Sequence, residues 1–264
     1  MKYYFLSGIP RAGNTILACI LNQNKDIGVS ANSLLSEVLY HLNEMKKNDV
    51  AFNNFRDEKS YHSMLAGIIP SYYSGWECQY ILDRSSWGTP YNLNLLKKYC
   101  PNDIKIVCLV RDVAEVFCSW IDWANRTSNN YIDRDTNNGS LEDKYRYLFH
   151  PERQLVKTIL SVKNLMEVDP DKKMHICVDY DDIIHNPKKE IDRIYKFLDI
   201  PFYKHDFKNI KQFEVNGLCY DDSILGNGLH TIRTNNISKR SYNIEVPQHL
   251  IDRCRDLNVW KNNR

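Results

Sequence analysis

Short, almost wholly apolar runs alternate with longer amphipathic runs along most of the chain. The apolar runs that predict strands are residues 3–7, 79–83, 104–110 and 175–178. The amphipathic runs that predict helices are residues 13–22, 33–47, 113–123, 141–166 and 187–198. Parallel strands joined by covering helices produce this alternation. We therefore expect an α/β fold with three layers, α/β/α, around a central parallel sheet.

Length, charge and cysteine spacing narrow the class of protein. A chain of 264 residues can form one large core, because single cores extend to roughly 250–300 residues, so we expect residues 1–264 to form a single domain. The formal net charge of +2 is too small to attract nucleic acid or a membrane surface, and neither is expected as a partner. No apolar run approaches the ~18 residues of a transmembrane helix, and the apolar N-terminus is too short for a signal peptide, so we expect a cytoplasmic protein. The eight scattered cysteines include no C-x-x-C pair, which indicates buried thiols.

Two polar or turn-rich regions interrupt the alternation. At residues 127–140, Asp133, Asp135 and Asn137 have the odd-numbered spacing of a calcium loop. The glycine comes one place late, however, and no Glu occupies the twelfth position. We expect a mobile surface loop there and no metal site. The last sixty or so residues are turn-rich and are predicted to end in a short helix from Pro247.

A glycine-containing turn follows the first predicted strand. It reads Gly8-Ile-Pro-Arg-Ala-Gly-Asn-Thr, with two glycines at the spacing of a phosphate-binding loop. Backbone N–H groups in such a turn surround an anion at the positive end of the following helix. A nucleoside triphosphatase has Lys after the second glycine, whereas this chain has Asn14, and its nearest cation is Arg11. The turn predicts a cradle for one phosphate-like group, held by Arg11, Ala12, Gly13, Asn14 and Thr15.

A second arginine ends the third predicted strand. Arg111 follows the apolar run at residues 104–110, at the carboxyl edge where open α/β sheets bind ligands. A guanidinium there can hold a terminal phosphate through two parallel bonds. Ser119 follows eight residues later, a little over two helical turns, so its hydroxyl can share that phosphate. Tyr180 follows the last predicted strand, where the pattern alone predicts an aromatic side chain in the core.

Three segments resemble the sulfotransferases that use 3′-phosphoadenylyl sulfate (PAPS). Residues 6–17 are similar to their 5′-phosphosulfate loop, in the Pro-Arg-x-Gly form of tyrosylprotein sulfotransferases and bacterial relatives. Residues 106–120 resemble their 3′-phosphate motif, and residues 178–201 resemble their Tyr-Glu-Asp-Leu, Asn-Pro and Phe-Leu-Gly-Ile series. The resemblance implies a P-loop NTPase-like sulfotransferase fold, PAPS as the sulfuryl donor and 3′,5′-ADP as a product. It also implies a hydroxyl or amine acceptor on a small molecule, carbohydrate or peptide.

The resemblance further implies roles for single residues. It assigns Arg111 and Ser119 to the 3′-phosphate and Tyr180 to the adenine. Arg84 stands roughly where relatives place a Lys near the transferred group, and it is a cation but a poorer proton donor than Lys. Arg233 lies in a segment similar to the late loop that covers the cofactor in this family, and it would add to the 3′-phosphate site.

The chemistry needs charge stabilisation and a general base. Arg11 and the N–H groups of the turn are expected to stabilise charge on the leaving phosphate oxygen. Asn32 and Ser33 occupy the place where tyrosylprotein sulfotransferases have a Glu base. The remaining candidate bases are Glu37, His41 and His62. The expected catalytic residues are Arg11, Arg84 and Glu37.

Two other functions fit parts of the sequence. Asp83 ends an apolar strand, as the magnesium-binding Asp of a P-loop kinase does, so a small-molecule or nucleotide kinase using Mg-ATP is one alternative. The missing Lys of the turn weighs against it. A nucleotide-binding protein without catalysis is the other alternative, because the expected Glu is absent. Tight binding of 3′,5′-ADP without magnesium would favour the sulfotransferase over the kinase.

Overall fold

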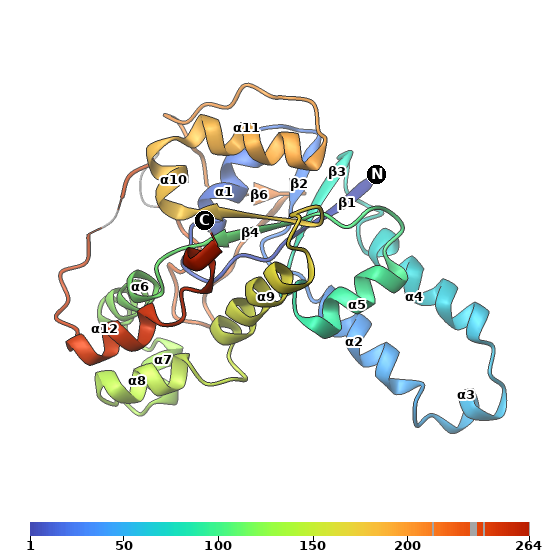
Figure 1. Cartoon of the computed structure of the whole chain (residues 1–264), viewed down its shortest axis with the longest axis horizontal. Helices are drawn as coiled ribbons and strands as arrows, with labels where there is room; N and C mark the ends of the chain where they lie inside the picture. The colour runs from blue at the N-terminus through green and yellow to red at the C-terminus, as the bar shows by residue number, and fades with distance from the viewer. Residues whose placement is uncertain (213, 233–236, 240, 264) are drawn as a thin grey trace.

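The computed structural model describes residues 1–212, 214–232, 237–239 and 241–263 (Figure 1). Its centre is a sheet of five parallel strands in the order β2-β3-β1-β4-β5. These strands are β1 (Lys2–Leu6), β2 (Ile27–Val29), β3 (Tyr80–Arg84), β4 (Ile106–Val110) and β5 (His175–Asp179). A separate antiparallel pair consists of β6 (Glu214–Val215) and β7 (Leu218–Cys219). The predicted α/β fold with a central parallel sheet is confirmed.

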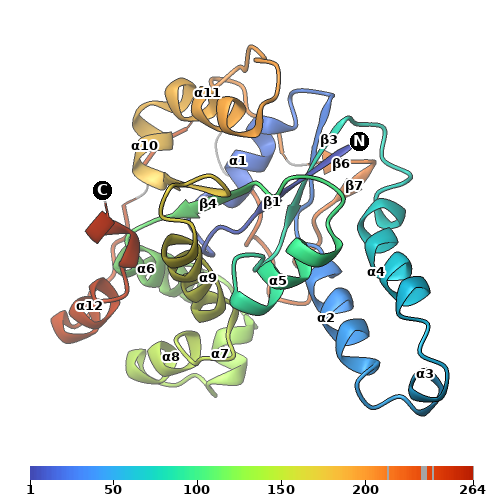
Figure 2. The ribbon, with the colours of Figure 1, turned by 45° about the vertical axis from the view of Figure 1, so that its right-hand side comes forward.

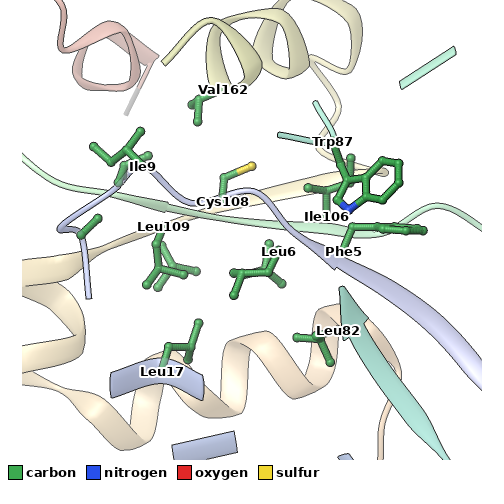
Figure 3. Close-up of a cluster of buried hydrophobic side chains, with 14 of the residues drawn as sticks. Phe5, Leu6, Ile9, Leu17, Leu82, Trp87, Ile106, Cys108, Leu109 and Val162 are labelled. Atoms are coloured by element: carbon green, nitrogen blue, oxygen red, sulfur yellow. The ribbon is translucent and has the colours of Figure 1, made fainter. Parts of the chain in front are cut away.

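Helices cover both faces of the sheet. Leu17 from α1 (Asn14–Leu21) and Val162 from α9 (Gln154–Val168) lie on opposite sides of the central strands (Figure 3). Every residue of β4 is buried, as expected for a strand covered on both faces. The layers therefore form the expected α/β/α arrangement.

The remaining helices extend and complete these layers. Those outside residues 127–168 are α2 (Leu35–Met45), α3 (Val50–Asn54), α4 (Glu58–Tyr72), α5 (Pro90–Tyr99), α6 (Val113–Arg126), α10 (Tyr180–His185), α11 (Pro187–Leu198), α12 (Gln248–Arg255) and the 3-10 helix η1 (Val259–Asn263). Helices α2, α3 and α4 form an arm that extends away from the sheet (Figure 2). The predicted helix at residues 187–198 has the observed bounds of α11.

The single long helix expected over residues 141–166 is wrong. The structure has two helices there, α8 (Leu141–Leu148) and α9. Pro151 lies between them. Proline lacks a backbone N–H and disfavours helical geometry in the residue before it, so the amphipathic pattern continues while the helix does not.

The surface loop expected over residues 127–140 is partly helical, and its expected mobility stays a prediction. It contains the short helix α7 (Tyr131–Asp135), and the side chain of Asn130 accepts a hydrogen bond from the N–H of Asp133 at 2.9 Å. The carboxylate of Asp133 forms an ion pair with Lys144 at 2.5 Å. The acidic residues of this segment therefore take part in local contacts, and the described part of the chain holds no cluster of metal-binding side chains.

Two expectations concern the whole chain. No helix among the described residues is both long enough and apolar enough to cross a lipid bilayer. No disulfide joins the eight cysteines, all of which are described. Three of them are buried, namely Cys19, Cys108 and Cys254, whereas Cys219 is exposed. The expectation of buried thiols therefore holds for part of the set.

Strand register brings the candidate residues to one edge of the sheet. Leu6 of β1 pairs with Arg84 of β3, and Val110 of β4 pairs with Asp179 of β5. Strands β3 and β2 lie on one side of β1, and strands β4 and β5 lie on the other side. Such a reversal opens a crevice at the carboxyl ends of the strands.

Candidate active site

The turn after β1 depends on left-handed backbone geometry. Arg11 has a φ of 65° and Gly13 a φ of 88°. Gly13 precedes the first turn of α1, and it offers no side chain to bond the first N–H groups of that helix. A Cβ on Gly13 would lie 2.9 Å from the ring of Tyr180. Glycine is therefore required by both the backbone and the close packing, and the positive end of α1 stays available to an anion.

Asn14 braces the turn from within. Its side chain is buried, and its Nδ2 donates a hydrogen bond to the carbonyl of Ile9 at 2.7 Å. A Cβ on Gly8 would come within 2.0 Å of the Asn14 Oδ1. The N–H of Ala12 is also used inside the turn, where it bonds the Ile9 carbonyl at 3.3 Å. The side chain of Asn14 thus maintains the turn, at the position where a triphosphatase has its phosphate-binding Lys.

Arg11 joins the turn to α6 and to the C-terminal segment. Its Nε donates to the Ser119 hydroxyl at 3.1 Å, and its Nη1 donates to the Leu229 carbonyl at 2.9 Å. Its guanidinium carbon lies 5.4 Å from the centre of the Trp120 ring. The structure therefore brings Arg11 and Ser119, from two of the predicted motifs, into direct contact.

Arg111 is held by contacts on several sides. Its Nε and Nη2 donate to one carboxylate oxygen of Glu115 at 3.0 and 2.9 Å. Its Nη1 donates to the carbonyl of Arg11 at 3.1 Å and to the Tyr242 hydroxyl at 3.0 Å. Burial disfavours the charge of this guanidinium, but the neighbouring tyrosines and Glu115 outweigh burial and raise the pKa of Arg111. The two predicted anion-binding arginines thus meet at one edge of the sheet.

Tyr180 packs between the guanidinium of Arg111 and the turn after β1. The guanidinium carbon of Arg111 lies 4.1 Å from the centre of its ring, and Gly13 approaches the ring edge. The side chain is largely buried, with 8% of its surface exposed. This arrangement makes Tyr180 a support for Arg111 and the turn. Its assignment to adenine remains a prediction.

Two cavities adjoin at this edge. The first, of about 330 Å³, is here called the loop cavity and is lined by Arg11, Gly13, Asn14, Thr15, Arg84, Arg111, Ser119 and Tyr180, among others. The second, of about 550 Å³, is here called the outer cavity, and its lining includes Glu37, Tyr131, Tyr147 and Gln154. The residues that line both cavities are Pro10, Arg84, Trp120, Leu229 and His230.

The other predicted site residues fall in different places. Ala12 lines neither cavity, because its side chain lies in the hydrophobic core. Glu37 lines the outer cavity, but 69% of its side chain is exposed and it lies 4.0 Å from His41. His41 and His62 line neither cavity. Arg233 lies outside the described residues.

Arg84 is a partly buried cation on the wall between the cavities. It ends β3, and its Nη1 donates to the carbonyl of Ala31 at 2.9 Å. Burial lowers the pKa of Arg84 to about 10, so the guanidinium stays charged at neutral pH. A charge held in this environment interacts more strongly with a developing anion than one in water.

Asp83 faces the core instead of the cavities. Its carboxylate accepts hydrogen bonds from the Ser33 hydroxyl at 2.8 Å, from the Trp87 indole at 2.6 Å and from the Tyr73 hydroxyl. The residue is completely buried and lines neither cavity. Its carboxylate is therefore committed to internal bonds, which removes the magnesium-binding residue that the kinase alternative needs.

His230 is a cavity residue that sequence reasoning missed. Its Nδ1 lies 2.6 Å from the Oδ1 of Asp222, and its backbone N–H donates to the Oδ2 of the same carboxylate at 2.7 Å. Its ring stacks on Tyr220, with centroids 3.8 Å apart. The segment has neither a helical nor a strand period in the sequence, so only the folded chain reveals these contacts.

Comparison with known proteins agrees with this architecture. The family model described as a sulfotransferase domain matches residues 2–220. The chain is similar to the solved sulfotransferase domain from the curacin biosynthetic pathway, with 14% sequence identity, a TM-score of 0.62 and coverage of 97% of this chain and 96% of the other. It is also similar to the sulfotransferase domain from the Synechococcus PCC 7002 olefin synthase, with 14% identity, a TM-score of 0.54 and coverage of 97% and 93%. At these identities the two structures support the fold alone.

No curated protein sequence matches the chain significantly. The family match spans the turn after β1, the Arg111 segment and the Tyr180 segment. These are the segments whose resemblance predicted the family, and the parallel sheet orders them as that prediction requires. The chain therefore belongs to the sulfotransferase domain family.

Proposed function

We propose that this protein transfers a sulfuryl group from PAPS to a hydroxyl or amine acceptor and releases 3′,5′-ADP. The observation that carries the proposal is the convergence of Arg11 and Arg111 on the loop cavity, where Arg111 donates to the Arg11 carbonyl at 3.1 Å. A nucleotide with anionic groups at both its 3′ and 5′ positions suits two adjacent cationic sites. A nucleotide with one anionic end would use only one of them.

The 5′ end of the donor would occupy the turn after β1. The uncapped first turn of α1 and the guanidinium of Arg11 supply N–H donors and positive charge on one side of the loop cavity. Such groups stabilise negative charge that gathers on a leaving phosphate oxygen. Arg84, on the wall shared with the outer cavity, would act nearest to the transferred group.

The 3′-phosphate would lie beside Arg111. Ser119 bonds Arg11, and Tyr242 bonds Arg111, so polar donors from two further segments line the same cavity. The fit requires a phosphate to compete with Glu115 for the guanidinium. A doubly charged phosphate is a strong bidentate partner for arginine.

The acceptor would enter the outer cavity. Aromatic side chains from three elements contribute to its lining, namely Trp120, Tyr131 and Tyr147. The five residues shared with the loop cavity connect the two spaces. Donor and acceptor would therefore meet from opposite directions where the two cavities join, as in-line transfer requires.

Calorimetric titration with 3′,5′-ADP tests the donor. We expect the protein to bind 3′,5′-ADP without magnesium, and more tightly than 5′-AMP, which lacks the 3′-phosphate. Labelled PAPS then tests the transfer, with release of labelled sulfate or a labelled product as the readout. A preference for Mg-ATP over 3′,5′-ADP would contradict the proposal and favour a kinase. Binding of 3′,5′-ADP without any loss of label from PAPS would favour a protein that binds the nucleotide without catalysis.

A further inference from the structure

His230 lies where the two cavities join, which is where the reacting groups of donor and acceptor would meet. It lies on the wall shared by the loop cavity and the outer cavity, together with Arg84. These are the two ionisable residues among the five that line both spaces. The other charged groups near the ring are Asp222 and Arg11, and Tyr220 stacks against it. An imidazole here can reach groups in either cavity.

Asp222 fixes the orientation and the tautomer of this imidazole. The carboxylate is buried, with 7% of its surface exposed, and it accepts both the backbone N–H and the ring Nδ1–H of His230. A carboxylate is only an acceptor, so Nδ1 must carry the proton. In the neutral ring the Nε2 lone pair is then available. Tyr220 restricts rotation of the ring through the stack at 3.8 Å.

The surroundings keep the ring neutral near neutral pH. Burial lowers the pKa of His230 from its ordinary value, and the positive charges of Arg84 and Arg11 lower it further, while Asp222 opposes both effects. A neutral histidine with one nitrogen anchored by a carboxylate is the form that accepts a proton from a hydroxyl.

We propose that His230 is the general base that activates the acceptor, and that Asp222 is its positioning residue. The inference rests on the proposed sulfuryl transfer. As the acceptor oxygen forms its bond to sulfur, its proton passes to Nε2 of His230. The bond between sulfur and the bridging oxygen of the donor breaks, and its electron pair stays on the phosphate of 3′,5′-ADP. The imidazolium that forms keeps its Nδ1–H bond to Asp222.

This assignment differs from the base expected from the sequence. Glu37 lines the outer cavity alone, and 69% of its side chain is exposed. Among the described residues, no hydrogen bond fixes the Glu37 carboxylate in one orientation within this cavity, and its ion-pair partner His41 is itself exposed. His230 combines access to both cavities with a fixed lone pair, which Glu37 lacks.

The test compares four variants: His230→Gln, Asp222→Asn, Glu37→Gln and His185→Gln. In His230→Gln the backbone N–H of residue 230 can still donate to Asp222, so the buried carboxylate keeps a partner. His185 is an exposed histidine on α10 and serves as the matched control. Loss of label from PAPS is measured with water and with 2-naphthol as acceptors, because the natural acceptor is unidentified. Affinity for 3′,5′-ADP and the melting temperature report folding and donor binding.

We expect His230→Gln to lower kcat by about 10²–10⁴-fold, the range of general base catalysis, while its affinity for 3′,5′-ADP stays within about twofold. Asp222→Asn and Glu37→Gln should each cause a smaller loss than His230→Gln, and the control His185→Gln should retain the wild-type rate. The wild-type rate should rise with pH below about 6.5, the ordinary pKa of histidine, and then level off. This rise should be absent in His230→Gln.

A second measurement does not depend on turnover. Nitrogen NMR of the labelled histidines in the protein alone should show His230 as the Nδ1–H tautomer, with a pKa below the ordinary histidine value of about 6.5. Wild-type transfer that survives in His230→Gln, or an Nε2–H tautomer, would overturn the base assignment while leaving sulfuryl transfer intact. If the wild type neither binds 3′,5′-ADP nor releases label, the proposed function itself fails, and the base assignment fails with it.

Discussion

Arg111, the residue proposed to bind the 3′-phosphate, also supports neighbouring parts of the site. Its guanidinium contacts Glu115, Tyr242, the Tyr180 ring and the carbonyl of Arg11. The contact with the carbonyl stabilises the left-handed conformation of Arg11. Removal of the guanidinium should therefore affect both the 3′ and the 5′ ends of a bound nucleotide, but not equally.

We expect Arg111→Ala to weaken binding of 3′,5′-ADP by about 10- to 100-fold. A hydrogen bond to a charged group contributes about 1.5–3 kcal/mol, and each 1.4 kcal/mol is about tenfold in affinity. Affinity for 5′-AMP should change less, because that ligand lacks the 3′-phosphate. Calorimetry with both ligands measures the difference. Arg126→Ala is the control, since Arg126 is exposed at the end of α6, the helix that begins two residues after Arg111. Equal losses for the two ligands would show that Arg111 acts only as a support.

Arg84 should influence both the rate and its pH dependence. We expect Arg84→Ala to lower kcat by about 10²-fold, as removal of one stabilising donor does. Its positive charge also lowers the pKa of His230. Without that charge the pKa of His230 rises, so the pH at which the rate is half-maximal should move upward. Arg84→Lys retains the charge and should keep the wild-type midpoint. An unchanged midpoint in Arg84→Ala would show that the two side chains do not interact.

At the scale of elements, the junction of β1 and α1 sets the geometry of the loop cavity. Positive φ angles at Arg11 and Gly13 turn the chain, and the bond from Asn14 to the Ile9 carbonyl closes the turn. Asn14, which makes this internal bond, occupies the position of the phosphate-binding Lys in triphosphatases. The N-terminus of α1 therefore stays accessible to an anion, and the positive side chain of the turn is Arg11.

Gly13→Ala tests the geometry of that junction. An alanine at a φ of 88° is strained, and its Cβ would lie 2.9 Å from the Tyr180 ring. We expect a loss of about 1–3 kcal/mol in the free energy of unfolding and weaker binding of 3′,5′-ADP. Gly67→Ala is the control, because Gly67 lies within α4 and a Cβ there would meet nothing within 4 Å. This control should stabilise the protein by about 0.5–1 kcal/mol. Urea unfolding of both variants measures the contrast, and unchanged stability in Gly13→Ala would contradict it.

The prediction of elements from the sequence succeeded where a local pattern decides the structure. The strand at Ile106–Val110 and the helix at Pro187–Leu198 have clear apolar patterns and clear ends. The pattern failed at residues 149–153, where Pro151 ends a helix without interrupting the apolar spacing. It also missed β2, because a strand of three residues is shorter than a detectable period and depends on pairing with β3.

At the scale of the whole molecule, the site draws on segments that are distant in sequence. The motifs at Arg11, Arg111 and Tyr180 could be predicted because each follows a strand of one parallel sheet, and the ends of such strands meet at one edge. The pair of Asp222 and His230 could not be predicted in this way. It lies in an irregular segment whose position depends on long-range contacts, such as the bond from Arg11 to the Leu229 carbonyl. Local chemistry in the sequence therefore indicates the residues that follow the strands, and tertiary packing determines the rest of the cavity lining.

The free energy of unfolding of the whole molecule should depend on pH through the carboxylate of Asp169. This carboxylate, at the end of α9, accepts the N–H groups of Lys173, Met174 and His175 and the ring of His175 at 2.9 Å. Burial alone would raise the pKa of Asp169, but the bonds from His175 and the neighbouring N–H groups outweigh it and lower the pKa. The stabilisation is therefore complete above the unfolded pKa of about 3.9 and is lost as pH falls through the lower folded value.

We expect Asp169→Asn to lower the free energy of unfolding at pH 7 by about 2 kcal/mol, because an amide cannot accept all of these bonds. The variant should also lose less stability than the wild type between about pH 5 and pH 1, the range over which a carboxylate with a lowered pKa becomes protonated. Urea unfolding at these pH values measures both effects. Asp171→Asn is the matched control, since its side chain is 71% exposed and bonds only Lys173 among the described ion pairs. Equal acid sensitivity in the wild type and Asp169→Asn would show that other carboxylates control acid unfolding.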